Sequence, residues 1–165
     1  MTTTPQSGND RVLNHTHQWV APERWHQHDI AELFRDVTAN RYTRSGPMTP
    51  ADSIGMAAHL CSDEMKATVA MVLEDESHNA YGWVAVGLNP DGRAELGGLI
   101  DSKALGLWPA SRLGRLGVQR IMEAARAKWP GVTVCAVVNK RNTFAKRMLR
   151  RSSTMLITYT DGVRQ

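Results

Sequence analysis

A run of seven residues in the last third of the chain constrains the fold more than any other feature. Residues 132–138 read VTVCAVV, in which only Thr133 is polar. A short run that is apolar at successive positions is typical of a strand buried on both faces, in the middle of a sheet with helices on either side. The run follows the longest amphipathic segment, residues 111–129, which ends at Pro130 and Gly131. We therefore expect a sheet covered by helices.

The middle of the chain supplies the neighbouring strands. Residues 67–73, 81–87 and 94–100 are short apolar runs with β-branched content, bounded by polar clusters. The turn signal Asn89-Pro90-Asp91-Gly92 joins the last two, so we expect an antiparallel meander. Residues 154–160 predict a closing strand, and residues 18–25 predict a short first strand or an ordered lead-in.

Three further helices are expected from caps and apolar spacing. Asp29 can cap a helix over residues 30–37, Thr49 with Pro50 can begin one that runs to about residue 60, and Asn142 can cap a final helix. The resulting order of helices and strands predicts a single α+β domain over residues 15–165, with one mixed, mostly antiparallel sheet flanked by helices. Residues 1–14 are polar and without periodicity, and we expect a flexible tail there.

Composition agrees with one ordinary globular domain. The chain has 165 residues, 42% of them hydrophobic and 22% charged, which disfavours a second domain, disorder and a disulfide scaffold. Cys61 and Cys135 lack metal-ligand spacing and are expected to be buried thiols in a reducing compartment. No apolar run reaches the roughly 18 residues that a membrane span needs, and no secretory signal is recognised. We therefore expect a cytosolic protein with no membrane partner.

The net charge of +4 hides an uneven distribution. Eleven basic residues and a single acid, Glu123, lie between Arg112 and Arg151, which gives this segment +10 and leaves −6 for the rest of the chain. A basic segment of this kind permits an anionic partner.

From residue 67 to residue 160, the order of elements and the local residues resemble the GNAT N-acetyltransferase superfamily. In that family a loop after the fourth strand holds the pyrophosphate of acetyl-CoA at the start of the long helix, where unpaired amides and the helix dipole favour an anion. The loop signature is Arg or Gln, two residues, Gly, one residue, then Gly or Ala. Counted from Arg112, Arg115 replaces the first Gly and Gly117 fits the second. The resemblance thus implies acetyl-CoA as cofactor, with these candidates to hold it: Arg112, Leu113, Gly114, Arg115, Leu116 and Gly117. The same segment is also typical of a helix start whose small residues pack against a sheet.

A second block of the resemblance follows the buried strand. The family has Asn, two residues, Ala, three residues, Tyr, and later Gly-Phe. Asn142 and Ala145 fit, and Asn142 is implied to contact the cofactor. Leu149 stands where the family often has a tyrosine that gives a proton to the departing CoA thiolate, and leucine cannot exchange a proton.

Glu95 stands near the position of a glutamate that often acts as the base in the family. An amine is charged at neutral pH and must lose a proton before it attacks a thioester, and a carboxylate with a raised pKa in a partly apolar site suits that task. Glu95 also alternates with Ala94 and Leu96, which is the pattern of a solvated carboxylate on a sheet face. Both interpretations of Glu95 stay open at this point.

A narrower resemblance covers residues 120–149. It is similar to GNAT-like phage proteins grouped with internal virion protein A of short-tailed phages, on Asn142-Thr143 followed by Arg147 and Leu149. This resemblance implies a protein of particle assembly that acts by binding, with weak or no acetyl transfer, in the host cytoplasm or the virion interior. Its partners would be other phage virion proteins or host proteins.

Two alternatives remain beside that hypothesis. One is an acetyl-CoA-dependent N-acetyltransferase that acts on an amine of a protein or a small molecule. The other is a binder of nucleic acid or another anionic ligand through the basic segment. The basic residues of 140–151 mostly lie opposite the apolar residues of the same helix, however, as they do on a solvated helix face. The pairs His15/His17 and His26/His28 have spacing that a metal could use, but we expect surface histidines and no metal.

Overall fold

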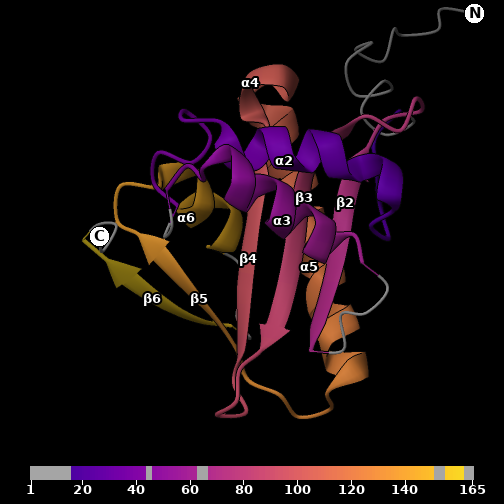
Figure 1. Ribbon diagram of the computed structural model, residues 1–165. Helices are drawn as coiled ribbons and strands as arrows, with labels where there is room; N and C mark the ends of the chain where they lie inside the picture. The colour runs from indigo at the N-terminus through magenta and orange to yellow at the C-terminus, as the bar shows by residue number, and fades with distance from the viewer. Residues whose placement is uncertain (1–15, 44–45, 63–66, 151–154, 162–165) are drawn as a thin grey trace, which may run out of the picture.

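Six strands form one sheet in which the spatial order equals the order along the chain (Figure 1). The computed structural model describes residues 16–43, 46–62, 67–150 and 155–161. The first four strands pair antiparallel, and the fourth, fifth and sixth pair parallel. The strands are β1 (Gln18–Val20), β2 (Thr68–Glu74), β3 (Ala80–Leu88), β4 (Ala94–Ile100), β5 (Val134–Asn139) and β6 (Leu156–Thr160). The predicted meander and the mixed, mostly antiparallel sheet are therefore confirmed.

Helices cover both faces of the sheet, as Figure 1 shows. On one face lie α2 (Gln27–Arg35) and α3 (Pro50–Leu60), and on the other lie α5 (Leu107–Lys128) and α6 (Thr143–Leu149). A turn of 3₁₀ helix, η1 (Arg24–His26), leads into α2, and the short α4 (Ser102–Leu105) precedes α5. Because parallel strands need a crossover connection, α5 and α6 are the elements that carry the chain back between β4, β5 and β6. The result is one α+β domain.

A separate apolar core fills each side of the sheet. Beneath α5 the core includes the fully buried Val86, Ile121 and Val134, and beneath α2 and α3 it includes Ile30 and Val72. Consecutive strand residues therefore serve different cores, as the two-residue period of a strand requires. None of the described helices is both long and apolar enough to span a membrane.

The caps predicted from sequence are right at two of three helices. The Thr49 hydroxyl accepts the backbone N–H of Asp52 at 3.2 Å, and Oδ1 of Asn142 accepts that of Ala145 at 3.0 Å. The prediction for Asp29 is wrong, because α2 begins at Gln27 and the Asp29 carboxylate accepts the N–H of Ala80 instead. Asp29 thus ties α2 to the start of β3.

The long helix begins four residues earlier than the predicted Ser111. Gly106, with φ +86°, precedes Leu107, and Pro109 lies in the first turn of α5. A proline is tolerated there because the first amides of a helix have no acceptor within the helix. Residues 107–110, which precede the predicted helix, are therefore already helical.

The interpretation of residues 132–138 needs a correction as well. Strand β5 pairs on both edges, as expected, and Val134, Ala136 and Val138 are buried beneath α5. Cys135 and Val137 on the opposite face are only half-buried, and Val137 lines a cavity. The apolar run thus has one face in the core and a half-buried opposite face, and Ala136, Val137 and Val138 all line the cavity. The expected tail at residues 1–14 lies outside the described residues.

Both cysteines are free thiols. Burial, with a contribution from the charge of Glu23, raises the pKa of the Cys61 thiol to about 11. Cys61 is therefore a buried apolar side chain at neutral pH, whereas Cys135 is half-buried and its Sγ donates to the carbonyl of Ala94.

Candidate functional site

The two central strands of the sheet separate soon after they meet. Strand β4 pairs with β5 only at Ala94–Val134 and Glu95–Cys135, whereas it pairs with β3 along its whole length. Figure 1 shows β4 and β5 diverging toward the carboxyl end of β4. The edge of β4 from Leu96 to Ile100 therefore presents backbone groups that no β5 residue satisfies. An extended ligand with amide groups can pair with such an edge.

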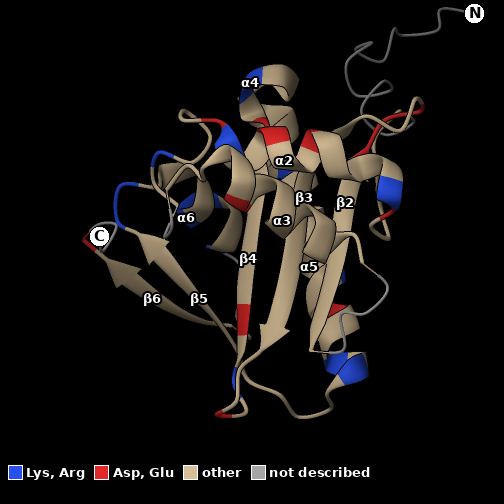
Figure 2. Ribbon diagram, in the orientation of Figure 1, with Lys and Arg blue, Asp and Glu red and all other residues tan. Residues whose placement is uncertain are grey.

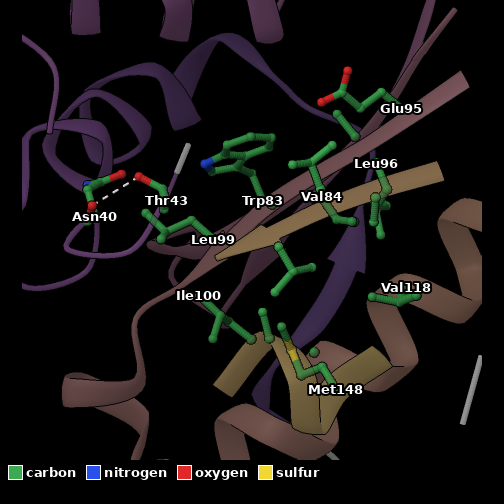
Figure 3. A pocket seen from close by; sticks show the side chains of 18 of the residues that line it. Asn40, Thr43, Trp83, Val84, Glu95, Leu96, Leu99, Ile100, Val118 and Met148 are labelled. Carbon is green, nitrogen blue, oxygen red and sulfur yellow. Dashed lines mark hydrogen bonds between the residues drawn. The ribbon is translucent and has the colours of Figure 1, made fainter. Parts of the chain in front are cut away.

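A cavity of about 530 Å³ occupies this gap and reaches both faces of the sheet. On one side it is lined by Phe34 of α2, Met56 of α3 and Trp83 of β3, and on the other by Val118 of α5 and Met148 of α6. Figure 3 shows several of these side chains around the same space. A cavity that passes through a sheet can hold two molecules that enter from opposite faces.

Glu95 lies at the point where the strands part, and its side chain lines the cavity. It is half-buried. Its neighbours across the sheet are Gly87 of β3 and Cys135 of β5. On the far side of Gly87, the residue paired with it is Thr68 of β2. Because Gly87 has no side chain, it leaves room between Glu95 and Thr68 on this face. Glu95 is therefore placed beside the cavity, and not on a fully solvated sheet face.

Trp83 supplies an aromatic wall of the cavity and carries an unsatisfied donor. Its ring packs against Phe34 with centroids 5.2 Å apart. The indole Nε1 is buried and has no hydrogen-bond partner. In Figure 3 this nitrogen is turned toward Asn40 and Thr43, on the side of the cavity away from Glu95. Buried donors in proteins are nearly always paired, so this one marks a place for an acceptor.

A second cavity of about 200 Å³ adjoins the first at the carboxyl ends of β4 and β5. Its lining includes Ser102 and Lys103, which follow β4, and Arg141 and Asn142, which follow β5. Lys103 and Arg141 are exposed. Asp36 and Asp101 also line it. The lining therefore carries two cations and two carboxylates, and Lys103 and Arg141 are the groups in it that can donate charge-assisted hydrogen bonds to an anion.

Comparison with known proteins assigns the fold. No family model matches the sequence, and a search of curated proteins also finds no match. The structure is similar to a spermidine N-acetyltransferase from Vibrio cholerae, solved with CoA and spermine, with 18% identity, coverage of 84% of this chain and 80% of that chain, and a TM-score of 0.64. It is also similar to a GNAT-family acetyltransferase from Bacillus anthracis, with 13% identity, 84% and 80% coverage and a TM-score of 0.60. The chain has the GNAT fold.

A third similar structure is a GCN5-related N-acetyltransferase from Kribbella flavida, with 18% identity, coverage of 68% of this chain and 67% of that chain, and a TM-score of 0.54. The resemblance seen in the sequence is thus confirmed for the GNAT fold. The narrower similarity to phage internal virion proteins stays a prediction.

Within this GNAT fold, the sequence-predicted cofactor loop lies inside a helix. Residues 112–117 fall in the second and third turns of α5, where each backbone N–H donates to a carbonyl one turn earlier. Arg112 is exposed, and Arg115 is half-buried with its Nε buried and unpaired. Of these six residues only Gly114 lines a cavity, whereas Asn142 lines both. The true start of the long helix is Gly106–Trp108, beside Lys103.

Gly114 and Gly117 have packing roles. A Cβ at Gly117 would lie 2.5 Å from ring carbons of Trp19, and a Cβ at Gly114 would meet the sulfur of Met148. Trp19 is held in place because its Nε1 donates to the carbonyl of Leu113 at 2.8 Å. The alternative interpretation, small residues that pack against the sheet, therefore describes Gly117, which meets Trp19 of β1, whereas Gly114 meets Met148 of α6.

Leu149, which the resemblance places at the position of the family tyrosine, is a core residue with no proton to give. Leu149 is 4% exposed and belongs to the core beneath α5. Of the three tyrosines in the chain, Tyr42 lines both cavities, Tyr81 donates its hydroxyl hydrogen to Asp75, and Tyr159 lies beneath Lys146. Sequence reasoning missed Tyr42 because it lies in the segment between α2 and α3, far from the family position in the chain.

One buried polar cluster lies away from the cavities. His26 is fully buried, its Nδ1 accepts the N–H of Glu23 at 2.9 Å, and its Nε2 is 2.7 Å from the carboxylate of Glu74. Nε2 is therefore the protonated nitrogen, and it donates to Glu74. The expectation of a surface histidine is wrong for His26. The described residues hold no group of side chains suited to a metal ion.

The basic segment does not gather in one place. In Figure 2, Lys and Arg lie at the end of α5 and, separately, around α6. Arg126 and Lys128 belong to the first group, and Lys146 and Arg147 to the second. A charge of +10 in the sequence is thus divided in space.

Proposed function

We propose that the protein is an N-acetyltransferase that uses acetyl-CoA and acts on an amine. The observation that carries the proposal is the open edge of β4 beside a cavity that contains Glu95. The unpaired backbone groups from Leu96 to Ile100 suit the amide groups of a pantetheine arm, and the apolar walls suit its thioester end. The bound cofactor would supply an activated acetyl group.

Two side chains of the cavity are suited to move protons. The Glu95 carboxylate accepts a proton from the ammonium group, which leaves a neutral nitrogen able to attack. The Tyr42 phenol, which lines both cavities, would be the side chain able to give a proton to the sulfur of the thiol product and to regain one from solvent. Tyr42 would thus be the proton donor that Leu149, which has no ionisable group, cannot be.

The anionic part of the cofactor is assigned to the second cavity. Lys103 and Arg141 stand at the ends of β4 and β5, where the diphosphate would lie if the pantetheine arm follows the β4 edge. Charge-assisted hydrogen bonds from these side chains would hold it. Arg112 and Arg115 line neither cavity, so removing this pair of cations is a matched control for removing Lys103 and Arg141.

Titration calorimetry with acetyl-CoA tests the proposal. Wild type should bind, Lys103→Ala with Arg141→Ala should weaken binding by roughly tenfold or more, and Arg112→Ala with Arg115→Ala should stay within about twofold. Glu95→Gln should lower acetyl transfer by about a hundredfold with little change in acetyl-CoA affinity. Absence of binding at millimolar acetyl-CoA would refute the proposal.

A second candidate is a binding protein of the internal virion type, with weak or no acetyl transfer. The buried Leu149 favours it, because the position at which the family often has a proton donor holds a core residue. This candidate predicts that acetyl transfer to the amines tested is weak or absent. Genes for capsid or core proteins on either side of the coding sequence would support it.

A further inference from the structure

The part of the large cavity beneath α2 and α3 is apolar and built around rings. Phe34, Met48, Met56 and Leu60 line it from the helical layer, and Trp83 and Leu99 line it from the sheet. Phe34 and Trp83 are in contact with each other, as are Trp83 and Gly97, where an added Cβ would lie 3.5 Å from the indole. A flat, apolar body therefore fits between the sheet and the helices on this side.

Charge in this cavity is scarce. Among the described residues that line it, Glu95 is the one carboxylate, and the other titratable side chains are those of Tyr42 and His59. A single carboxylate can balance a single ammonium group. Each further ammonium group of a polyamine would lose its hydration without an anion to replace it, which is costly in an apolar site.

The unpaired Nε1 of Trp83 requires a hydrogen-bond acceptor at the end of the cavity away from Glu95. It is buried and lacks a partner, and Figure 3 shows it turned away from Glu95 and toward Thr43. The Thr43 hydroxyl donates to the carbonyl of Asn40 at 3.0 Å and still has lone pairs to accept with, but it forms no hydrogen bond with Nε1 of Trp83. An acceptor for the indole N–H is therefore expected from the ligand.

We infer that the acetyl acceptor is a monoamine whose amino group is joined to an apolar, ring-sized body with an oxygen atom at the far end. The ammonium group lies at Glu95, the ring lies against Trp83, and the oxygen accepts from Nε1 of Trp83. Arylalkylamines with a ring hydroxyl have this arrangement, and polyamines do not. This inference rests on the proposed function for the reaction, although the site itself binds without acetyl-CoA.

The inference is tested by measuring the affinity of the full chain for tyramine, phenethylamine and spermidine, with calorimetry and tryptophan fluorescence as the two readouts. Tyramine should bind about fivefold more tightly than phenethylamine, which lacks only the hydroxyl, because one neutral hydrogen bond is lost. Spermidine should not bind at concentrations that saturate the site with tyramine. Glu95→Gln should weaken both aromatic amines by tenfold or more.

Trp83→Phe keeps a ring but removes the donor, so it should abolish the difference between tyramine and phenethylamine. Trp25→Phe is the matched control, because Trp25 is 57% exposed and packs against His26 and His78, away from the cavity. It should leave the difference unchanged. Continued binding of phenethylamine by Trp83→Phe shows that the variant is folded.

Three results overturn the inference: spermidine binding as tightly as tyramine, equal binding of tyramine and phenethylamine by wild type, or a tyramine preference that survives in Trp83→Phe. Acetyl transfer with spermidine preferred would refute this substrate class while the proposed function stands. The predicted amine binding without any binding of acetyl-CoA would refute the proposed function while the amine site stands.

Discussion

Replacing Gly117 by alanine is expected to destabilise the protein, and the same change at Gly114 is expected to cost little. Both glycines lie in α5 and are buried. The new Cβ at position 117 would lie 2.5 Å from the Trp19 ring, which is 5% exposed and fixed by its hydrogen bond to Leu113. At position 114 the nearest atoms belong to Met148, a flexible and half-buried side chain.

The magnitude follows from two opposing contributions. Alanine is favoured over glycine in a helix by about 1 kcal/mol, and overpacking a filled core costs about 1–3 kcal/mol. At Gly117 the rigid indole must shift, so we expect a net loss of up to about 2 kcal/mol. At Gly114 the thioether can rotate away, so the helical gain dominates and stability should stay level or rise by up to about 1 kcal/mol.

Urea unfolding of wild type and both variants measures this difference, with the midpoint as readout and the slope as a check that the unfolded state is unchanged. Equal losses in the two variants would contradict the packing argument. If instead these glycines allow a cofactor to approach the backbone, Gly117→Ala would keep its stability and lose affinity for acetyl-CoA. The two explanations therefore separate in one pair of variants.

Three further predictions concern other parts of the fold. Burial alone would raise the pKa of Glu74, but hydrogen bonds from His26 and His78 outweigh it and hold the pKa below its ordinary value of about 4.5. The stabilisation from these hydrogen bonds is therefore fully present above about pH 4.5 and is lost as pH falls through the lowered pKa. The urea midpoint should drop over that pH range in wild type and less in Glu74→Gln. Tyr42→Phe should slow acetyl transfer by about a hundredfold and leave acetyl-CoA affinity within about twofold, and an unchanged rate would remove Tyr42 as proton donor. Thr49→Ala should cost about 1 kcal/mol in urea unfolding, because its hydroxyl accepts a first-turn amide of α3.

The sequence predicts the fold well where the signal is local. The alternation and turn at residues 81–100 predict a meander, and the caps at Thr49 and Asn142 predict helix starts, because each depends on neighbours within a few residues. Asp29 breaks this rule. Its carboxylate accepts the backbone N–H of Ala80, which is 51 positions away in the chain. No pattern of neighbouring residues predicts that contact.

The site is harder to predict because its parts come from distant segments. Glu95 is a candidate because it stands near the position of the family's glutamate, and the structure adds its place beside the cavity. Tyr42 and Trp83 come from a connection and a neighbouring strand, so only the folded chain brings them to one cavity. The start of the long helix was predicted too late, at Ser111, because the helix already begins after Gly106 and tolerates Pro109 in its first turn.

The brief contact between β4 and β5 has a consequence for how the molecule opens. Strands β5 and β6, with α6, are joined to the rest of the sheet through two ladder pairs. Their amide hydrogens should exchange with solvent through a smaller, local opening than those of β2 and β3. A molecule that fills the gap would bridge the two parts and slow that exchange, because binding to the closed form stabilises it. Filling of the gap by a ligand and slower amide exchange in the last third of the chain should therefore rise together with ligand concentration.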